Sequence, residues 1–257
     1  MKIQYISDLH LEMLDNYNYL IDFPLEKHGD ILVIAGDLLP YMHMERHRPF
    51  FQRILKPFDR VFWLPGNHEY YHSQLKNDNG SRICEKIEKN ILLIDNYSEI
   101  IGKTKLIFST LWSELSNRFA ADIQLCLNDF RMIKTTNGHD LDLQTYSVLH
   151  QSALSFIKKE IAKTKSEDIE KIIVVTHHAP TFLHYPKEYI GSFLNSAFAT
   201  ELSGFIAQSN IDYWIYGHHH RNISDFNINK TQILTNQLGY VRRNENKNFS
   251  WNRVIEI

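Results

Sequence analysis

Five short signatures along the chain carry side chains of the types that hold divalent metal ions. They are Asp8-Leu9-His10, Gly36-Asp37, Gly66-Asn67-His68-Glu69, His177 and Gly217-His218-His219-His220. Carboxylate and amide oxygens combined with imidazole nitrogens suit Mn, Fe, Zn or Co rather than a metal that is selected by thiolates. Any one signature alone would be weak, but together they supply enough ligands for two ions. Two such ions, about 3.5–4 Å apart, can bind both the attacking and the leaving oxygen of an in-line displacement.

Each signature directly follows a short apolar segment that is typical of a β-strand. The five segments are residues 2–7, 31–35, 60–64, 171–176 and 213–216. Because functional groups gather at the carboxyl ends of strands in open α/β sheets, we expect the five signatures to converge on one site. Gly36, Gly66 and Gly217 each precede a candidate ligand at a strand exit. A residue without Cβ lets the backbone approach a ligand closely at such a place.

The remaining pattern alternates strands and helices without a repeat or a flexible linker, which favours a single domain over residues 1–257. Further strands are predicted at 91–94, 105–109, 223–228, 232–235 and 253–257. Apolar residues three and four apart predict a helix over 143–163, and weaker patterns predict helices over 49–55, 82–89 and 200–208. The irregular stretch 113–142 is expected to be an insertion of loop and helix over one edge of the site.

Composition sets the broad class of the protein. Hydrophobic residues make up 43% and charged residues 23% of the 257 residues, which is typical of a globular protein with a substantial core. The formal net charge of -2 and the lack of an interleaved basic and aromatic run argue against a nuclease. Cys84 and Cys126 stand in no metal-binding spacing and are expected to be reduced and semi-buried.

The sequence also argues against a membrane location. No run approaches the roughly 18 apolar residues of a membrane span. The first candidate ligand, Asp8, follows a strand that starts near Lys2, so removal of a signal peptide of about 15–30 residues would remove the site. We therefore expect a cytoplasmic protein without a membrane partner.

In this order and spacing the signatures resemble the calcineurin-like metallophosphoesterases, whose pattern is DxH, GD, GNH[D/E], a lone His and GHxH. The match runs from Asp8 to His220, which is most of the chain. Within the family, the chain resembles a branch of small bacterial members. The resemblance implies an α/β fold: a four-layer α/β/β/α sandwich of two mixed β-sheets flanked by helices. It implies a hydrolase that acts on the phosphoric ester bonds of a small phosphorylated substrate.

The same resemblance implies a role for each matching residue. Asp37 would bridge two metal ions, of which Mn is the first choice. The other ligands would be Asp8, His10 and His220 at one ion and Asn67, His177 and His218 at the other. His68 would be the catalytic histidine that faces the substrate. A hydroxide that bridges the metals would be the nucleophile, because metal binding lowers the pKa of water by many units.

One position departs from the family pattern. Many members read GDxxD, and the second acid supports the catalytic histidine. Here the sequence is Gly36-Asp37-Leu38-Leu39-Pro40, so a proline stands in that place. Since proline has no side-chain acceptor, His68 must have another orienting partner or none. Metal binding should be unaffected by this change.

Three residues outside the signatures' ligand positions are candidates for substrate contact. Tyr70 could stack on an aromatic group of the substrate, Trp112 could form a pocket wall, and His178 could line the pocket. The alternative for each is a packing role. Arg131 could meet a phosphate or form a structural ion pair. Arg242 and Arg243 are expected on a solvated polar turn.

The sequence leaves several alternatives open. The same motifs serve phosphomonoesters and phosphodiesters. A closed pocket favours monoesters and an open groove favours diesters, and the sequence does not show which shape the site has. A non-catalytic interaction scaffold of the same fold is the alternative to an enzyme, although every ligand and His68 are present. A hydrolase of non-phosphate esters is a third class that the fold does not exclude. The native metal pair, the physiological substrate and the oligomeric state do not follow from the sequence.

Overall fold

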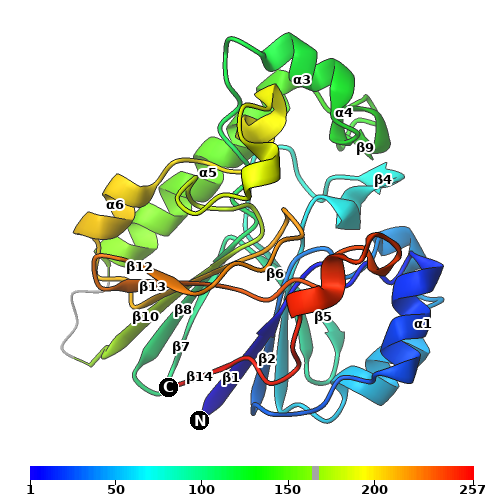
Figure 1. The fold of residues 1–257 in the computed structure, drawn as a ribbon, viewed down its shortest axis with the longest axis vertical. Helices are drawn as coiled ribbons and strands as arrows, with labels where there is room; N and C mark the ends of the chain where they lie inside the picture. The colour runs from blue at the N-terminus through cyan, green and yellow to red at the C-terminus, as the bar shows by residue number, and fades with distance from the viewer. Residues whose placement is uncertain (164–167) are drawn as a thin grey trace.

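Residues 1–163 and 168–257, which the computed structural model describes, form two six-stranded mixed β-sheets with helices on both outer faces (Figure 1). The first sheet has the order β14 (Val254–Glu256), β1 (Lys2–Ile6), β2 (Ile31–Ala35), β3 (Arg60–Leu64), β6 (Ile91–Asp95) and β5 (Ile83–Glu88). The second has the order β12 (Phe226–Ile228), β13 (Thr231–Thr235), β11 (Tyr213–Tyr216), β10 (Lys171–Thr176), β8 (Thr104–Ser109) and β7 (Tyr97–Ile101).

The central strands of each sheet run parallel, so their carboxyl ends lie at one edge. Strands β1, β2, β3 and β6 are parallel to one another, as are β8, β10, β11 and β13. The apolar run Ile31–Ala35 is buried at every position because both faces of its sheet are covered. Ile31, Val33 and Ala35 face the second sheet, whereas Leu32 and Ile34 face the helices. Continuous rather than alternating hydrophobicity therefore follows from the sandwich.

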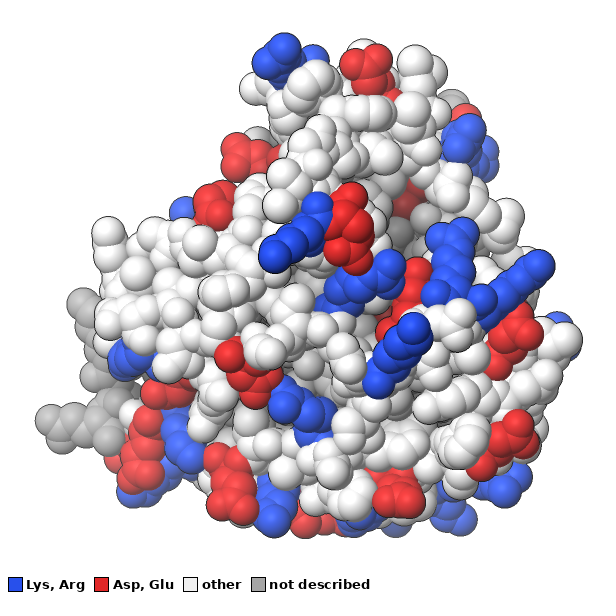
Figure 2. Space-filling model, in the orientation of Figure 1, with Lys and Arg blue, Asp and Glu red and all other residues white. Residues whose placement is uncertain are grey.

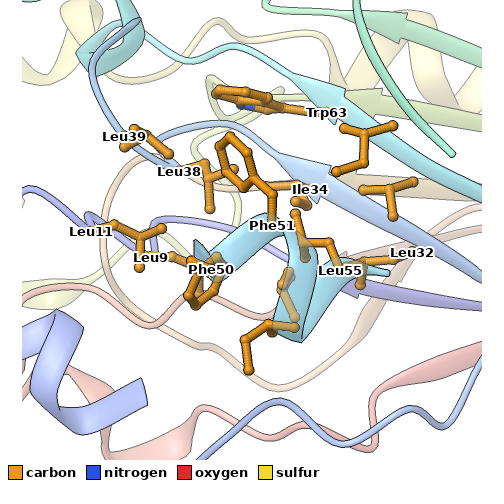
Figure 3. Close-up of a cluster of buried hydrophobic side chains, with 14 of the residues drawn as sticks. Leu9, Leu11, Leu32, Ile34, Leu38, Leu39, Phe50, Phe51, Leu55 and Trp63 are labelled. Carbon is orange, nitrogen blue, oxygen red and sulfur yellow. The ribbon is translucent and has the colours of Figure 1, made fainter. Parts of the chain in front are cut away.

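The outer face of the first sheet holds the loops that carry two of the signatures. Leu9 and Leu11 alternate with Asp8 and His10, and their side chains join the buried cluster over this face, as do Leu38 and Leu39 (Figure 3). Phe50 and Phe51 cover the cluster from the helical segment α2 (Arg48–Phe50) and its continuation Phe51–Leu55. Each ligand loop is thus fixed by the hydrophobic residues between and after its ligands.

The outer face of the second sheet is covered by α5 (Leu143–Ala162) and α6 (Ser203–Gln208). The side chain of Asp142 accepts a hydrogen bond from Thr145 N at 2.7 Å and so caps the start of α5. Ile157 of α5 packs with Val174 and Trp214 of the sheet. This confirms the helices predicted at 143–163 and 200–208, apart from differences at their ends.

The stretch 113–142 folds beyond the end of the sandwich, at the top of Figure 1. It contains α3 (Ala120–Cys126), α4 (Asp129–Met132) and the short strand β9 (Ile133–Lys134), which pairs with β4 (Ser73–Gln74). Short 3₁₀ helices occur at Tyr41–His43, His68–Tyr70, Lys187–Tyr189, Phe193–Ala197, Val241–Arg243 and Glu245–Asn248.

The structure differs from the sequence analysis at several points. The helix predicted over 82–89 is wrong: Ile83–Glu88 is the edge strand β5, antiparallel to β6 with a bulge between Lys86 and Glu88. The helix α1 (Leu14–Asp22) was not predicted, because its Asn, Asp and Tyr residues have weak helix propensity. Cys84 and Cys126 are free, as expected, but both are exposed.

The two ends of the chain lie side by side (Figure 1). Strand β1 pairs antiparallel with β14, and Ile257 N donates to Met1 O at 2.9 Å. Among the described residues, no helix combines the length and the apolar character that a membrane crossing requires.

Candidate metal centre

The five signatures meet where the parallel strands end. Asp8 follows β1, Asp37 follows β2, Asn67 follows β3, His177 follows β10 and His218 follows β11. The first three come from one sheet and the last two from the other, so the site lies across the edge of the sandwich. We call the seven residues Asp8, His10, Asp37, Asn67, His177, His218 and His220 the ligand floor.

Five floor residues adopt left-handed backbone angles. The φ values are 55° at Asp8, 45° at His10, 53° at Asp37, 79° at His218 and 53° at His220. Such angles are uncommon outside glycine and cost of order 1–3 kcal/mol each where they are strained. Their concentration at this edge indicates that the strand exits are shaped for the site rather than for stability.

Two glycines make room for the floor, as the sequence suggested. A Cβ at Gly36, where φ is 92°, would lie 2.1 Å from Nδ1 of His177. A Cβ at Gly66 would lie 2.2 Å from Oδ1 of Asp37 and 2.6 Å from Nε2 of His177. Any larger residue at either position would therefore displace a floor side chain.

The first group of floor atoms contains Asp8, His10, Asp37 and His220, whose ligand atoms all lie within 4.8 Å of one another. Nε2 of His10 lies 2.9 Å from Nε2 of His220. Oδ1 of Asp8 is 3.4 Å from the His220 nitrogen, and Oδ2 of Asp37 is 3.6 Å from the His10 nitrogen.

The second group shares Asp37 with the first. Nε2 of His177 lies 3.0 Å from Nδ1 of His218, and Oδ2 of Asp37 is 3.4 Å from the same His177 nitrogen. The side-chain oxygen of Asn67 completes the group, 3.3 Å from His177 Nε2. Asp37 Oδ2 is thus the oxygen that faces both groups.

These donors fit divalent cations. In each group two imidazole nitrogens point at one another beside carboxylate oxygens, an arrangement that requires a proton or a metal ion between them. Burial lowers the pKa of His177, but the charges of Asp37 and Asp8 raise it to about 9. Burial likewise lowers the pKa of His220, and hydrogen bonds to Asp8 and Glu245 raise it to about 9. The negative charge of the floor therefore attracts cations strongly.

Most floor ligands are held by a second contact on the side away from the site. Nδ1 of His10 lies 3.0 Å from Oε1 of Glu12, and Nδ1 of His220 lies 2.9 Å from Oε2 of Glu245. The backbone oxygen of Ala35 lies 2.9 Å from Nδ1 of His177. Such contacts fix the tautomer and the ring orientation of metal-binding histidines.

Asn67 is oriented in the same way. Its amide nitrogen donates to Oδ1 of Asp129 at 2.9 Å, which turns its oxygen toward His177. Asp129 comes from α4 in the inserted stretch, and Tyr71 donates to the same Asp129 oxygen at 2.8 Å. Neither Asp129 nor Glu245 belongs to one of the five signatures, whereas Glu12 lies two residues after His10 in a DxHxE run.

Glu69, the last residue of its signature, is buried and joins two strand exits. Its carboxylate accepts hydrogen bonds from the backbone nitrogens of Asp37, Leu38 and Gly66 at 2.7–3.0 Å. Trp63 Nε1 also donates to it, at 2.9 Å. Burial and the charge of Asp37 raise the pKa of Glu69 to about 8, but all four partners are N–H donors, so the group acts as a hydrogen-bond acceptor that ties the β2 exit to the β3 exit.

His68 lies beside the floor but makes different contacts. Its backbone nitrogen donates to Asp37 Oδ1 at 3.0 Å, and its ring stacks on Tyr71 with 4.1 Å between centroids. Its Nδ1 lies 3.1 Å from Oε1 of Glu12. Glu12 is thus the acid that contacts a ring nitrogen of His68, whereas Pro40 has no side-chain acceptor.

A cavity of about 390 Å³ opens above the floor. Its base includes Asp37, Asn67, His68, His218 and His220. Its sides come from three segments, 126–129, 185–198 and 240–245, which we call the cavity wall. Figure 2 shows this face hollowed between the α3–α4 region and the C-terminal segment, with Lys and Arg side chains near the rim.

The three residues expected to contact a substrate lie elsewhere. Tyr70, Trp112 and His178 are buried, and none belongs to the described residues that line the cavity. Trp112 stacks between them, with ring centroids 6.2 Å from Tyr70 and 5.7 Å from His178. The structure therefore favours the packing alternative for all three, whereas Tyr71 does line the cavity.

The cavity also differs from the sequence expectation at two arginines. Arg131 is exposed and donates to Asn128 Oδ1 at 2.8 Å, outside the described residues that line the cavity. Arg243 is exposed, as expected, but it lines the cavity with its guanidinium 5.2 Å from the ring of Tyr240.

Comparison with known proteins agrees with this geometry. The family model of the calcineurin-like phosphoesterases matches residues 1–222. The chain belongs to the calcineurin-like phosphoesterase family. This family is metal-dependent, and the ligand floor is the candidate metal site of the present member.

Two relatives of this calcineurin-like phosphoesterase show how far the likeness extends. An uncharacterized protein of Acanthamoeba polyphaga mimivirus is 34% identical over an alignment of 283 positions, 99% of this chain and 96% of that protein. An uncharacterized metallophosphoesterase of Helicobacter pylori strain J99 is 35% identical over 77 positions, which span 28% of this chain and 20% of that protein.

Among solved structures, phosphopantetheinyl hydrolase from Mycobacterium tuberculosis is similar, with a TM-score of 0.66 over 99% of this chain and 95% of that one. The sequence identity is 14%, so this likeness shows a shared fold. The expected α/β architecture of mixed sheets flanked by helices is thereby confirmed for this calcineurin-like phosphoesterase.

Proposed function

We propose that this chain hydrolyses phosphoric ester bonds of small molecules with two divalent metal ions bound at the ligand floor. The observation that carries the proposal is Asp37, whose Oδ2 lies 3.4 Å from His177 Nε2 in one ligand group and 3.6 Å from His10 Nε2 in the other. A carboxylate shared by two groups of this kind is the arrangement that a two-metal phosphoesterase requires.

Each ion would have its own set of ligands beside Asp37. Asp8, His10 and His220 would hold one, and Asn67, His177 and His218 the other. The first set has a second carboxylate, whereas the second has a neutral amide, so the first ion would be bound more tightly. Bound ions would supply an activated water for in-line attack and positive charge for the phosphoryl oxygens. Mn is the first metal to test, followed by Fe, Zn and Co.

His68 would act on the substrate rather than on the metals. It lines the cavity, and its Nδ1 is occupied by Glu12, which leaves Nε2 for the substrate. Burial lowers the pKa of His68, but Asp37 and Glu12 raise it above its ordinary value overall. A raised pKa favours the protonated ring, which suits donation of a proton to the leaving oxygen.

The cavity supports a compact substrate. Its volume of about 390 Å³ is in the range of small-molecule sites. Tyr185, Phe198 and Tyr240 give its sides aromatic surface, and Arg243 is the one Lys or Arg among the described lining residues. A phosphomonoester with an apolar or aromatic organic group fits these sides better than a polymeric diester does.

The test is hydrolysis of p-nitrophenyl phosphate and bis-p-nitrophenyl phosphate, side by side, by metal-free protein reloaded with Mn, Fe, Zn or Co. We expect metal-dependent hydrolysis with preference for the monoester. Preference for the diester would leave the metal centre in place but overturn the substrate class. Two bound ions without hydrolysis of either ester would contradict the enzyme and favour the non-catalytic scaffold.

A further inference from the structure

We propose that Glu12 is the residue that positions His68, and that it couples His68 to the metal ligand His10 through a single shared carboxylate oxygen. The inference rests on the proposed function in that His68 is taken to face the substrate. It gives the role of the missing family acid to a residue from a different loop. Pro40 belongs to the β2 exit, whereas Glu12 belongs to the β1 exit.

The geometry around Glu12 is tight. Its Oε1 lies 3.0 Å from Nδ1 of His10 and 3.1 Å from Nδ1 of His68. The side chain of Glu12 is only 9% exposed, and those of His10 and His68 are 0% and 13% exposed. The two imidazole rings meet edge to face with 4.5 Å between centroids. One buried oxygen thus holds two rings at a fixed mutual angle.

The chemistry of a carboxylate then sets both histidines. An ionised carboxylate only accepts hydrogen bonds, so each imidazole must present an N–H at Nδ1. His10 is left with Nε2 toward His220 and Asp37, which is the nitrogen that a metal ion needs. His68, which lines the cavity, is left with Nε2 free for a leaving oxygen.

The other contacts of His68 do not fix which of its ring nitrogens faces the substrate. Tyr71 lies against the face of the ring and restricts its tilt, but a stacked ring still rotates between its two nitrogens. The hydrogen bond to Asp37 uses the backbone nitrogen and leaves the side chain free. Among the described residues, Glu12 is the one that contacts a ring nitrogen of His68. It therefore decides which nitrogen faces the substrate.

Two competing roles for Glu12 make different predictions. It could serve only as support for the ligand His10, as Glu245 serves His220. Alternatively Glu12, His10 and His68 could together hold a metal ion, since their ligand atoms also lie within 4.8 Å of one another. Glu245 provides a matched control for the first role, because its carboxylate contacts the Nδ1 of a floor histidine and, among the described residues, makes no contact with His68.

The experiment compares Glu12→Gln with Glu245→Gln on two phosphomonoesters, p-nitrophenyl phosphate and benzyl phosphate. The p-nitrophenolate ion leaves without a proton, whereas an alkoxide requires one. For Glu12→Gln we expect kcat on the benzyl ester to fall by about 10- to 100-fold, with a much smaller loss on the p-nitrophenyl ester. Glu245→Gln should weaken metal binding and lower both rates by the same factor.

A double variant tests whether Glu12 acts through His68. In a His68→Ala background, Glu12→Gln should cause no larger loss on the benzyl ester than on the p-nitrophenyl ester, because the positioned group is already absent and only the support of His10 is lost. Equal losses on both esters in the single variant would overturn the proposal and leave Glu12 as support for His10. Elemental analysis could also find three ions per chain in the unaltered protein and two in Glu12→Gln. That result would overturn the proposal in favour of a metal site at Glu12.

A readout without catalysis separates this inference from the proposed function. In Zn-loaded protein, ring-nitrogen NMR should show a proton on Nδ1 of His68, and Glu12→Gln should shift this signal while Glu245→Gln should not. A His68 that carries its proton only on Nε2 in the unaltered chain would overturn the positioning role even if no substituted protein folds. Absent hydrolysis with the expected His68 signals would instead count against the proposed function alone.

Discussion

The ligand floor and the cavity wall are built in opposite ways. Floor residues such as Asp8, His10 and His177 are fully buried and most of them have an anchoring contact on their far side. The wall belongs to connecting segments and short helices, and apolar side chains stand exposed within or beside it, with Ile190 72% and Leu125 74% exposed. The floor is therefore buried and anchored, whereas the wall is more exposed and mixes aromatic, apolar and polar side chains.

This difference separates two tasks. The exits of β1 and β2 repeat one device, in which ligands with left-handed backbone angles are followed by leucines that are buried in the cluster over the first sheet. They set the reaction, because metal geometry tolerates little displacement. Apart from Asp129 and Glu245, which hold the floor ligands Asn67 and His220, the wall residues have no such constraint, and they decide which organic group fits above the metals. Changes in the floor should thus abolish turnover, and changes at these other wall residues should alter the apparent affinity for substrate.

The largest effect is expected for Asp37→Asn in the floor. The shared oxygen loses its charge, so both ions should be weakened together, and kcat should fall by about 10³-fold or more, a loss of roughly 4 kcal/mol. Elemental analysis after dialysis should find less than one ion per chain. Full occupancy of both ions in this variant would show that Asp37 is not the bridging ligand.

A strong effect is expected for the pH dependence of metal binding. In the metal-free floor the pKa values of His177 and His220 are each about 9, because the nearby carboxylates outweigh burial. Each ring must lose its proton to bind a metal, so affinity should rise as pH rises toward about 9, by up to roughly tenfold per pH unit for each proton. Calorimetry of Mn binding in buffers of different ionisation enthalpy measures the released protons. An affinity that is constant between pH 6.5 and 9 would contradict the charge balance of the floor.

A smaller effect is expected for Arg243→Gln in the wall. The test uses a phosphomonoester whose organic part carries a second anionic group. For this substrate the KM of Arg243→Gln should rise about tenfold while kcat and metal content stay unchanged, since a charge-assisted hydrogen bond contributes roughly 1.5–3 kcal/mol. Arg242→Gln is the matched control, because Arg242 is exposed next to Arg243 but lies outside the described residues that line the cavity. Equal effects of the two substitutions would mean that the wall arginine acts only through general surface charge.

The same division explains what the sequence could predict. The floor could be found because each ligand follows an apolar strand directly, so that position in the chain fixes position in space. Asp129 and Glu245 could not, since they lie 62 and 25 residues from the side chains that they orient. Only the folded chain brings such pairs together.

Among the elements, β5 shows the limit of pattern analysis. Ile83 and Ile87 are four residues apart, a spacing that fits one face of a helix. Four is also an even number, so the same two residues fall on one face of a strand. Pairing with β6 decides in favour of the strand, and that pairing is a tertiary contact.

The shared role of Asp37 is tested most directly by a crystal structure of the Mn-loaded protein with anomalous scattering measured at the Mn edge. We expect two peaks about 3.5–4 Å apart, on either side of Asp37, one beside His10 and His220 and the other beside His177 and His218. A single peak, or two peaks without Asp37 between them, would contradict the shared floor on which the proposed activity rests.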